Sequence, residues 1–453
     1  MAMNTSPVTF PATLADRSLA ASVGPFAPEI LLEMEFGHTL DEVRLARAVA
    51  LLLDAEPILG CRFAPRKFRA RWEKLALEAK HVFTLARDKD EYGAFRNKPL
   101  QYFSGPQIHV CLYRSETRDS LMLKVSHLAA DAASVKYIAA RLSALYARPQ
   151  NEAESSPGTP KKSRRSFWQI ARHIPVYSYP KIFFNFLREI AASRAPKASH
   201  RAPLATSAQE AVHYSARHIA RDHAAPLFAY AKQHRATVND ILLAATFRAL
   251  AKTGDWDGKA ALRLVITIDL RKYARKTGNT AMANFSSMET ITYGTAMEED
   301  FEATLSRVRA IMDKRKSSWL GLNTCISTNW IIRPFPYSLL KNIVAKAWTA
   351  RGASPNTPDL FSNMGDIPAQ DLDFDGKPFR AWFSPPGCSL PFLFFSCSGY
   401  NGSLTFSAGP AVRKEDASAV DAFFDRIISE LPLDPPQAPC GSHRPLDTPE
   451  KTA

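Results

Sequence analysis

One histidine stands four residues before an aspartate in the stretch VSHLAADAAS, residues 125–134. Histidine has an ordinary pKa of about 6.5, which suits proton transfer near neutral pH, so His127 is a candidate general base. The alanines around it leave room for a substrate chain to approach. From spacing alone an alternative stays open, in which His127 is a core histidine bonded to a backbone carbonyl and Asp131 caps the following helix.

The H-x-x-x-D spacing alone is weak evidence, because it occurs three times, starting at His127, His218 and His443. The third copy lies in a proline-rich tail, and no apolar strand leads into the second. Only His127 follows a segment, DSLMLKVSH, whose apolar residues alternate as in a strand with one buried face. This context distinguishes His127 from the other two.

The elements that would position His127 are those of an α/β protein. Strands are expected at 105–114 and 119–127, with helices at 40–55 and 132–146. In the second half the pattern predicts helices at 236–252 and 416–430, helix-prone sequence at 300–350, strands at 262–270, 281–294 and 360–367, and a hairpin within 391–409.

Composition divides the chain into two lobes. We expect an N-terminal lobe at 1–148, a basic, aromatic-rich connector at 149–205, a C-terminal lobe at 206–432 and a disordered tail at 433–453. With 453 residues, 46% of them hydrophobic, the chain is long enough for two cores. We see neither a secretory signal nor an apolar run of about 20 residues, so a cytoplasmic protein is expected. The six scattered cysteines contain no C-x-x-C pair, which argues against structural zinc and a disulfide framework.

Positive charge is concentrated in the connector. The formal net charge of the chain is +14, and the segment 161–201 contains ten basic residues and one acidic residue. Seven aromatic residues lie among the basic ones. Such a segment suits an anionic membrane surface or an acidic carrier protein. No recognised nucleic-acid-binding motif accompanies it, so nucleic acid is not an expected partner. The alternative is a solvated connector whose aromatic residues pack on the neighbouring lobe.

Several motifs in the right order resemble a known superfamily. LKVSHLAADAAS (123–134) resembles the His-His-x-x-x-Asp-Gly region of peptide-synthesis condensation domains, wax-ester/diacylglycerol acyltransferases and polyketide-associated acyltransferases. LDEVRLARAVALLLDAEPILGCRF, ATVNDILLAA, ITIDLRKY, MANFSS and FSNMGDI resemble further motifs, so the similarity covers most of residues 30–430. The chain departs from the pattern at Ser126, in place of the first histidine, and at Ala132, in place of the glycine.

This resemblance implies two chloramphenicol-acetyltransferase-like lobes around a central substrate tunnel, and acyl transfer from a thioester to a hydroxyl or amine. It implies that His127 is the general base and that Asp131 pairs with Arg271 to brace the loop. The alternative for Arg271 is a surface residue at a strand end.

Other positions are expected near the substrates. Asn284 and Ser286 are candidates for hydrogen bonds to the reacting carbonyl, although edge-strand polar residues would look the same. Ser126, Asn363 and Gly365 are expected beside the tunnel, with Gly365 providing backbone freedom.

Three functions remain open. The leading one is a transferase that uses acyl-CoA and acts on a small-molecule or lipid acceptor, with no bound cofactor or metal and with peripheral membrane contact. The second takes its acyl group from a phosphopantetheinyl carrier protein in trans. The third is a catalytically inactive scaffold of the same fold.

Overall fold

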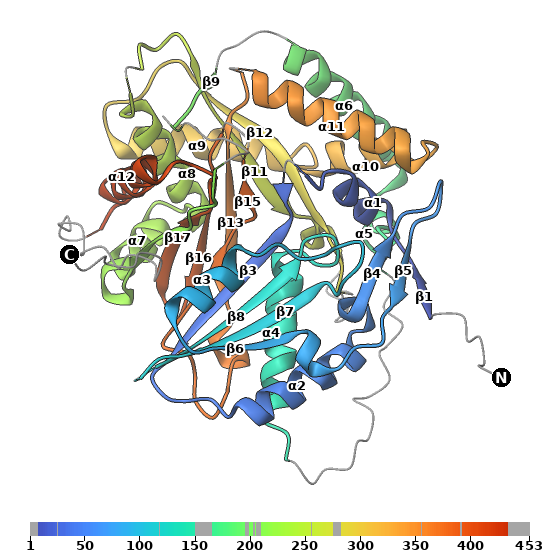
Figure 1. Ribbon diagram of the computed structural model, residues 1–453. Coiled ribbons are helices and arrows are strands. Elements are labelled where there is room, and N and C mark those ends of the chain that lie inside the picture. The colour runs from blue at the N-terminus through green and yellow to red at the C-terminus, as the bar shows by residue number, and fades with distance from the viewer. Residues whose placement is uncertain are drawn as a thin grey trace.

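Two β-sheets, each covered by helices, form the framework of the molecule (Figure 1). The structure is a computed structural model and describes residues 8–433, apart from 25, 117, 150–164, 195–198, 203, 205–209, 255, 275–281, 355 and 390–391. The side chains of 26, 189–194, 324, 327–330, 351–353 and 415 are also not described. The first part of the expected connector, the expected tail beyond 433, and His443 lie outside the described residues.

The first sheet carries the candidate histidine. Its strands follow the order β14-β3-β8-β7-β6, with β14 at Arg380–Ser384, β3 at Glu29–Phe36, β8 at Asp119–Ser126, β7 at Ile108–Arg114 and β6 at Phe83–Ala86. Helices α2 (Glu42–Ala55) and α4 (Ala132–Tyr146) pack together and share one core with this sheet. The expected strands at 105–114 and 119–127 and the expected helices at 40–55 and 132–146 are confirmed.

The second sheet comes from the second half of the chain. Its order is β10-β17-β16-β13-β11-β12, with β10 at Ser215–Ile219, β17 at Ser403–Ala408, β16 at Phe394–Tyr400, β13 at Asp359–Ile367, β11 at Ala261–Asp269 and β12 at Ser286–Gly294. The short β9 (Ser199–His200) pairs with β11. A core is shared with α7 (Arg221–Gln233), α8 (Val238–Ala251), α9 (Phe301–Lys316) and α12 (Ala417–Ser429).

The expected hairpin is formed by β16 and β17. Asn401 and Gly402 connect the two strands and have φ values of +47° and +80°. Positive φ at both central residues is what a two-residue turn between twisted strands requires, and Asn-Gly is a favoured pair there. The local turn chemistry therefore sets this connection.

One strand crosses between the two halves. β14 lies late in the chain but pairs antiparallel with β3, from Arg380 opposite Glu35 to Ser384 opposite Leu31. The first sheet is therefore completed by a strand about 250 residues beyond β8 in sequence.

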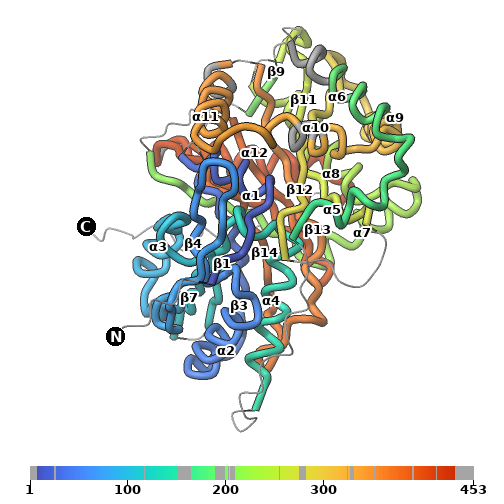
Figure 2. The backbone as a smooth tube through the Cα atoms, turned by 90° about the vertical axis from the view of Figure 1, so that its right-hand side faces the viewer, coloured from blue at the N-terminus to red at the C-terminus, as the bar shows by residue number. Residues whose placement is uncertain are grey.

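Smaller elements surround the sheets. β1 (Thr9–Pro11), β5 (Arg71–Lys74) and β4 (Cys61–Ala64) form a three-stranded sheet, and β2 (Phe26–Ala27) pairs with β15 (Gly387–Cys388). The remaining α-helices are α1 (Leu14–Ala21), α3 (Lys89–Asn97), α5 (Trp168–Ala171), α6 (Tyr179–Arg194), α10 (Leu322–Ile332) and α11 (Tyr337–Ala353). In the side view, α6, α10 and α11 lie at the opposite end of the molecule from α2 (Figure 2). Among the described helices, none combines the length and the apolar character that a bilayer crossing requires.

Candidate active site

The candidate histidine lies in a tight turn between β8 and α4. The backbone N–H of His127 donates to the carbonyl of Pro28 at 2.7 Å, and those of Ala129 and Ala130 donate to the carbonyl of Ser126 at 3.0 and 3.1 Å. These bonds fix the turn to the end of the sheet. The imidazole is therefore carried by a rigid strand end, as a catalytic group requires.

The hydrogen bonds of the His127 ring define its tautomer. Nδ1 lies 2.9 Å from the carbonyl oxygen of Ala130, which can only accept, and 3.2 Å from the amide nitrogen of Asn284, which can only donate. We assign the ring proton to Nδ1 because the Ala130 contact is the shorter one and the Asn284 amide has the backbone carbonyl of His127 as its acceptor. Nε2 then carries the lone pair, and none of the described residues forms a hydrogen bond with it. Burial lowers the pKa of His127 below its ordinary value, against the opposing effects of the Ala130 carbonyl and the Asp131 charge. The imidazole is therefore neutral near pH 7.

The carboxylate of Asp131 forms its hydrogen bonds with groups other than the His127 ring. One oxygen accepts the backbone N–H of Ser134 at 2.9 Å, which caps α4. The other accepts the N–H of Phe285 at 2.7 Å and Nη1 of Arg271 at 2.6 Å. Burial alone would raise the pKa of Asp131, yet the pKa is lowered because the Arg271 charge and these hydrogen bonds outweigh burial. The aspartate is an ionised brace between the loop and the second sheet.

Arg271 lies just beyond β11, in the 3-10 turn Leu270–Tyr273. Besides Asp131, its guanidinium donates to the hydroxyl of Ser134 at 2.9 Å and to the carbonyl of Ala283 at 3.0 Å. The residue thus joins the start of α4 to the segment that precedes β12. The structure brings together the two residues that the sequence analysis paired.

Asn284 and Ser286 also lie beside the loop. The amide nitrogen of Asn284 donates to the backbone carbonyl of His127 at 3.1 Å, and its Oδ1 accepts both the N–H and the hydroxyl of Ser286, at 2.9 and 2.6 Å. The Asn284 amide and the Ser286 hydroxyl therefore donate to protein oxygens in this structure, whereas the sequence analysis expected them to donate to a reacting carbonyl. In this arrangement Asn284 holds the backbone of His127.

The other three expected residues are less close to the imidazole. Ser126 is fully buried, and its hydroxyl accepts the backbone N–H two residues on, at 3.3 Å. Asn363 bonds to Asn239 at 3.2 Å and to the N–H of Gly365 at 2.9 Å. Gly365 has φ +69° at an irregularity in the pairing of β13 with β16, so its backbone freedom is used. These bonds join Asn363 to α8 rather than to the turn of His127.

Arg165 is a site residue that the sequence analysis did not single out. Its Nη1 donates to the carbonyl of Ala129 at 2.9 Å and to the carbonyl of Met282, and its Nη2 lies 3.2 Å from a carboxylate oxygen of Asp16. One side chain from the connector therefore holds the histidine turn, the segment before β12 and α1 together. In the sequence, Arg165 was distinguished only as one of the ten basic residues of the segment 161–201.

We expect Arg165→Ala to lower the free energy of unfolding by about 2–4 kcal/mol, because it removes hydrogen bonds from two carbonyls and leaves Asp16 without this cation. Arg172→Ala, seven residues on at an exposed position, is the matched control and is expected to change stability by less than about 0.5 kcal/mol. Urea denaturation of both variants measures the difference. Equal stability of the two would contradict the bracing role of Arg165.

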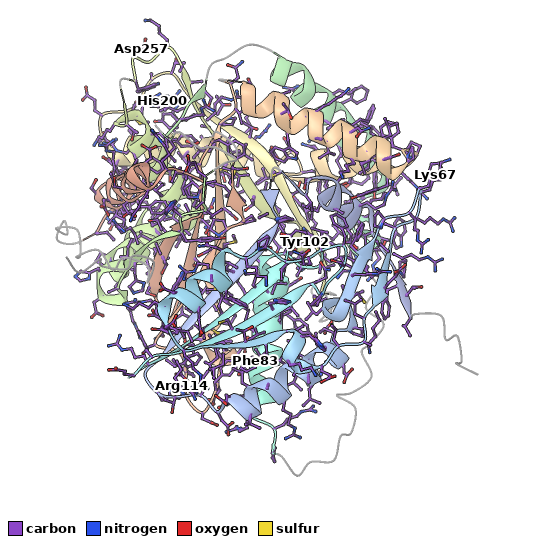
Figure 3. The ribbon with its side chains drawn as sticks, in the orientation of Figure 1. Lys67, Phe83, Tyr102, Arg114, His200 and Asp257 are labelled. Carbon is purple, nitrogen blue, oxygen red and sulfur yellow. The ribbon has the colours of Figure 1, made fainter. Side chains whose placement is uncertain are left out.

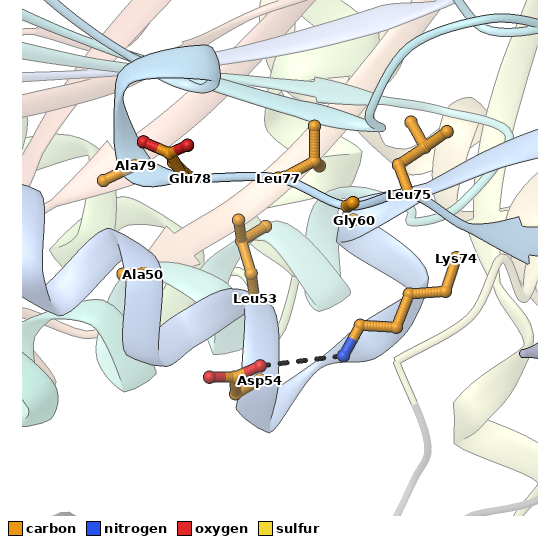
Figure 4. Close-up of a pocket in the computed structure, with 10 residues that line it drawn as sticks. Ala50, Leu53, Asp54, Gly60, Lys74, Leu75, Leu77, Glu78 and Ala79 are labelled. Carbon is orange, nitrogen blue, oxygen red and sulfur yellow. Dashed lines mark ion pairs between the residues drawn. The ribbon is translucent and has the colours of Figure 1, made fainter. Parts of the chain in front are cut away.

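A separate pocket of about 310 Å³ lies between α2, β5 and residues 75–79 (Figure 4). At its edge Lys74 Nζ lies 3.7 Å from a carboxylate oxygen of Asp54. No residue of the turn 127–131 lines it. The pocket is therefore distinct from the histidine site.

Comparison with known proteins rests on structure. No family model matches the chain, and no curated protein sequence is significantly similar to it. Solved structures, in contrast, match over nearly the whole length. Polyketide synthase associated protein 5 from Mycobacterium tuberculosis is 14% identical with a TM-score of 0.62, over 92% of this chain and 98% of that one.

Two further structures are similar to the same extent. The first condensation domain of the CDA synthetase is 14% identical with a TM-score of 0.69, over 95% of this chain and 98% of that one. Trichothecene 15-O-acetyltransferase from Fusarium sporotrichioides is 13% identical with a TM-score of 0.68, over 94% and 95% of the two chains. The chain therefore has the two-lobed, chloramphenicol-acetyltransferase-like fold of condensation domains and acyltransferases, and the expected fold class is confirmed.

Proposed function

We propose that this chain is an acyltransferase in which Nε2 of His127 is the general base. The observation that carries the proposal is the 2.9 Å contact of His127 Nδ1 with the Ala130 carbonyl, from which we assign the proton to Nδ1 and the lone pair to Nε2. The fold supports a transferase, since one protein with a similar structure is named an O-acetyltransferase and others are condensation domains. A neutral imidazole on a rigid turn is the group that such a reaction needs.

The proposed reaction needs one mobile proton. Nε2 of His127 takes the proton from the acceptor hydroxyl or amine as that group attacks the thioester carbonyl. The carbon–sulfur bond then breaks, and the same proton passes to the departing thiolate, so the products are an ester or amide and a free thiol. A thioester is already activated, so orientation of the two substrates supplies much of the acceleration and no bound cofactor is required.

The proposed donor is acyl-CoA. The formal net charge of +14 is suited to the phosphates of CoA. The same charge is suited to an acidic carrier protein, so a carrier-bound donor acting in trans is the alternative. The two are distinguished by transfer from acyl-CoA and from an acyl carrier protein measured side by side.

The test is thiol release from acyl-CoAs of increasing chain length, with an extract of the host's lipids and metabolites as the acceptor mixture. Release that requires the extract and disappears in His127→Ala would support the proposal, and the best donor would report the length of the acyl site. If thiol is released from carrier-bound donors but not from acyl-CoA, the carrier-dependent reaction is supported instead. A deletion phenotype rescued by His127→Ala would overturn both and support an inactive scaffold.

The pH dependence of kcat/KM follows from the lowered pKa of His127. The active form is the neutral imidazole, so activity falls as pH drops through the pKa of the free enzyme. Because burial lowers that pKa, the midpoint of the acid limb is expected below about 6.5. A midpoint clearly above that value would show that the imidazolium is stabilised and would contradict the lowered pKa of His127.

A further inference from the structure

Three segments that are distant in sequence meet at one end of the molecule. They are the tip of the β4–β5 hairpin (65–69), the connector from 165 to 188 with α5 and the part of α6 that precedes Glu189, and residues 322–350 with α10 and most of α11. Lys67 at the hairpin tip lies beside the end of α11 in Figure 3, and its carbonyl accepts the backbone N–H of Tyr337 at 2.7 Å. Helices α6 and α10 are in contact. We call these three segments the basic apolar end.

Acidic residues are absent from the sequence of the basic apolar end. None of 65–69, 165–188 and 322–350 contains aspartate or glutamate, and the acid-free run around α10 and α11 extends over 314–358. A run of this length without aspartate or glutamate is rare by chance in a chain with 44 acidic residues among 453. The absence of negative charge is therefore a property shared by three separate segments.

Large hydrophobic side chains are exposed at this end. Of the seventeen exposed large hydrophobic residues among those described, ten belong to it: Phe68, Trp168, Val176, Tyr177, Phe183, Phe184, Leu187, Ile331, Leu339 and Ile343. Val176 and Tyr177 are the most exposed, at 84% and 83%. Scattered apolar residues on a surface need no explanation, but a concentration of this kind marks a site of interaction.

Cations are exposed beside these apolar residues. The exposed ones are Arg66, Lys67, Arg69, Arg172, Lys181, Arg188, Arg333, Lys341 and Lys346. Arg66 pairs with Glu73 at 3.1 Å, whereas the other eight form no ion pair with a described carboxylate. Their charge is therefore available to an anionic partner.

We propose that the basic apolar end docks on the surface of an anionic phospholipid membrane. Amphipathic helices at such a surface bury aromatic and aliphatic side chains at the boundary of headgroups and acyl chains, while lysine and arginine meet the anionic headgroups. Protein interfaces are enriched in aromatic residues and arginine but depleted in lysine. Four of the nine exposed cations of this end are lysines, so its composition favours a membrane surface over an acidic protein. The proposal does not depend on the proposed acyl transfer.

Co-sedimentation with vesicles tests the proposal. We expect the full chain to bind vesicles that contain phosphatidylglycerol and phosphatidylcholine at low salt, and to bind pure phosphatidylcholine vesicles at least tenfold more weakly, since each cation near an anionic surface adds to the affinity. Raising the salt concentration should weaken binding, because it screens exposed charges. Equal binding to both kinds of vesicle, or to neither, would overturn the proposal.

Two variants separate charge from apolar contact. Lys341→Glu/Lys346→Glu is expected to weaken vesicle binding at least about tenfold. The matched control Lys89→Glu/Lys98→Glu, at the first residue and the C-cap of α3, makes the same change in net charge and is expected to leave binding within about twofold. Trp168→Ser/Phe184→Ser should weaken binding while keeping the fold, because both side chains are exposed, at 62% and 64%. Equal effects of the two charge variants, or unchanged binding of the serine variant, would refute docking at this end.

Discussion

Replacing His127 with alanine is expected to lower kcat/KM for acyl transfer by about 10²–10⁴-fold. The variant removes the lone pair on Nε2, which takes the acceptor proton, and leaves a turn whose backbone is held to Pro28 and Ser126 by its own hydrogen bonds. The rate should therefore fall without loss of the fold. Thiol release and the free energy of unfolding, measured on the same preparations, separate the two effects.

The matched control is His218→Ala. His218 begins a second H-x-x-x-D stretch, but it lies on β10, where its Nδ1 is 3.1 Å from the hydroxyl of Thr405. We expect this variant to keep kcat/KM within about twofold of the wild type, since it is remote in sequence and sheet from the turn of His127. A loss of activity equal to that of His127→Ala would show that the assay does not report on the proposed base.

The second large effect concerns the ion pair of Asp131 with Arg271. Arg271→Met leaves the Asp131 carboxylate buried without its cation and is expected to lower the free energy of unfolding by about 3–5 kcal/mol. Asp131→Asn is also expected to be destabilising, because it removes the buried carboxylate and leaves the guanidinium with the half-exposed Asp269, 3.2 Å away, as its anionic partner. Both variants should also lower kcat, since they release the start of α4 and with it the turn that carries the imidazole.

A double-mutant cycle measures whether the pair acts as a unit. The double variant is expected to lose less stability than the sum of the two single losses, by about 1–3 kcal/mol, because neither charge is then left alone. Arg380→Ala serves as the control, since this arginine forms a partly exposed pair with Glu35 at 3.2 Å, with side chains 24% and 25% exposed, and should cost less than about 1 kcal/mol. Simple additivity of Asp131→Asn and Arg271→Met would refute the brace.

Local pattern predicted the elements around the site well. Alternation of apolar residues predicted β8, and the helical spacing of apolar residues predicted α2. The motif order pointed to Asp131 and Arg271 together, although they are 140 residues apart. These features are encoded either in short windows or in motifs that keep their order.

Long-range placement was not predictable in the same way. The strand β3 carries Glu33, a charge that reads as solvent-exposed in the sequence, but in the structure it is buried against Arg96 and Tyr92. The sequence within a few residues of β14 does not indicate that this strand pairs with β3. Arg165 likewise gives no local sign that it reaches Ala129, because the contact depends on how the connector crosses the finished lobes.

The strand β14, which crosses from the second half of the chain to the first sheet, affects how the chain folds. As the polypeptide leaves the ribosome, β3 has β8 on one side, but its other edge has no partner until residues 380–384 emerge. An unpaired edge of this kind is a template for misassociation, and pairing over so long a loop slows folding. The first sheet therefore matures only after almost the whole chain has been synthesised, and β14 ties completion of the histidine's sheet to the synthesis of the second half.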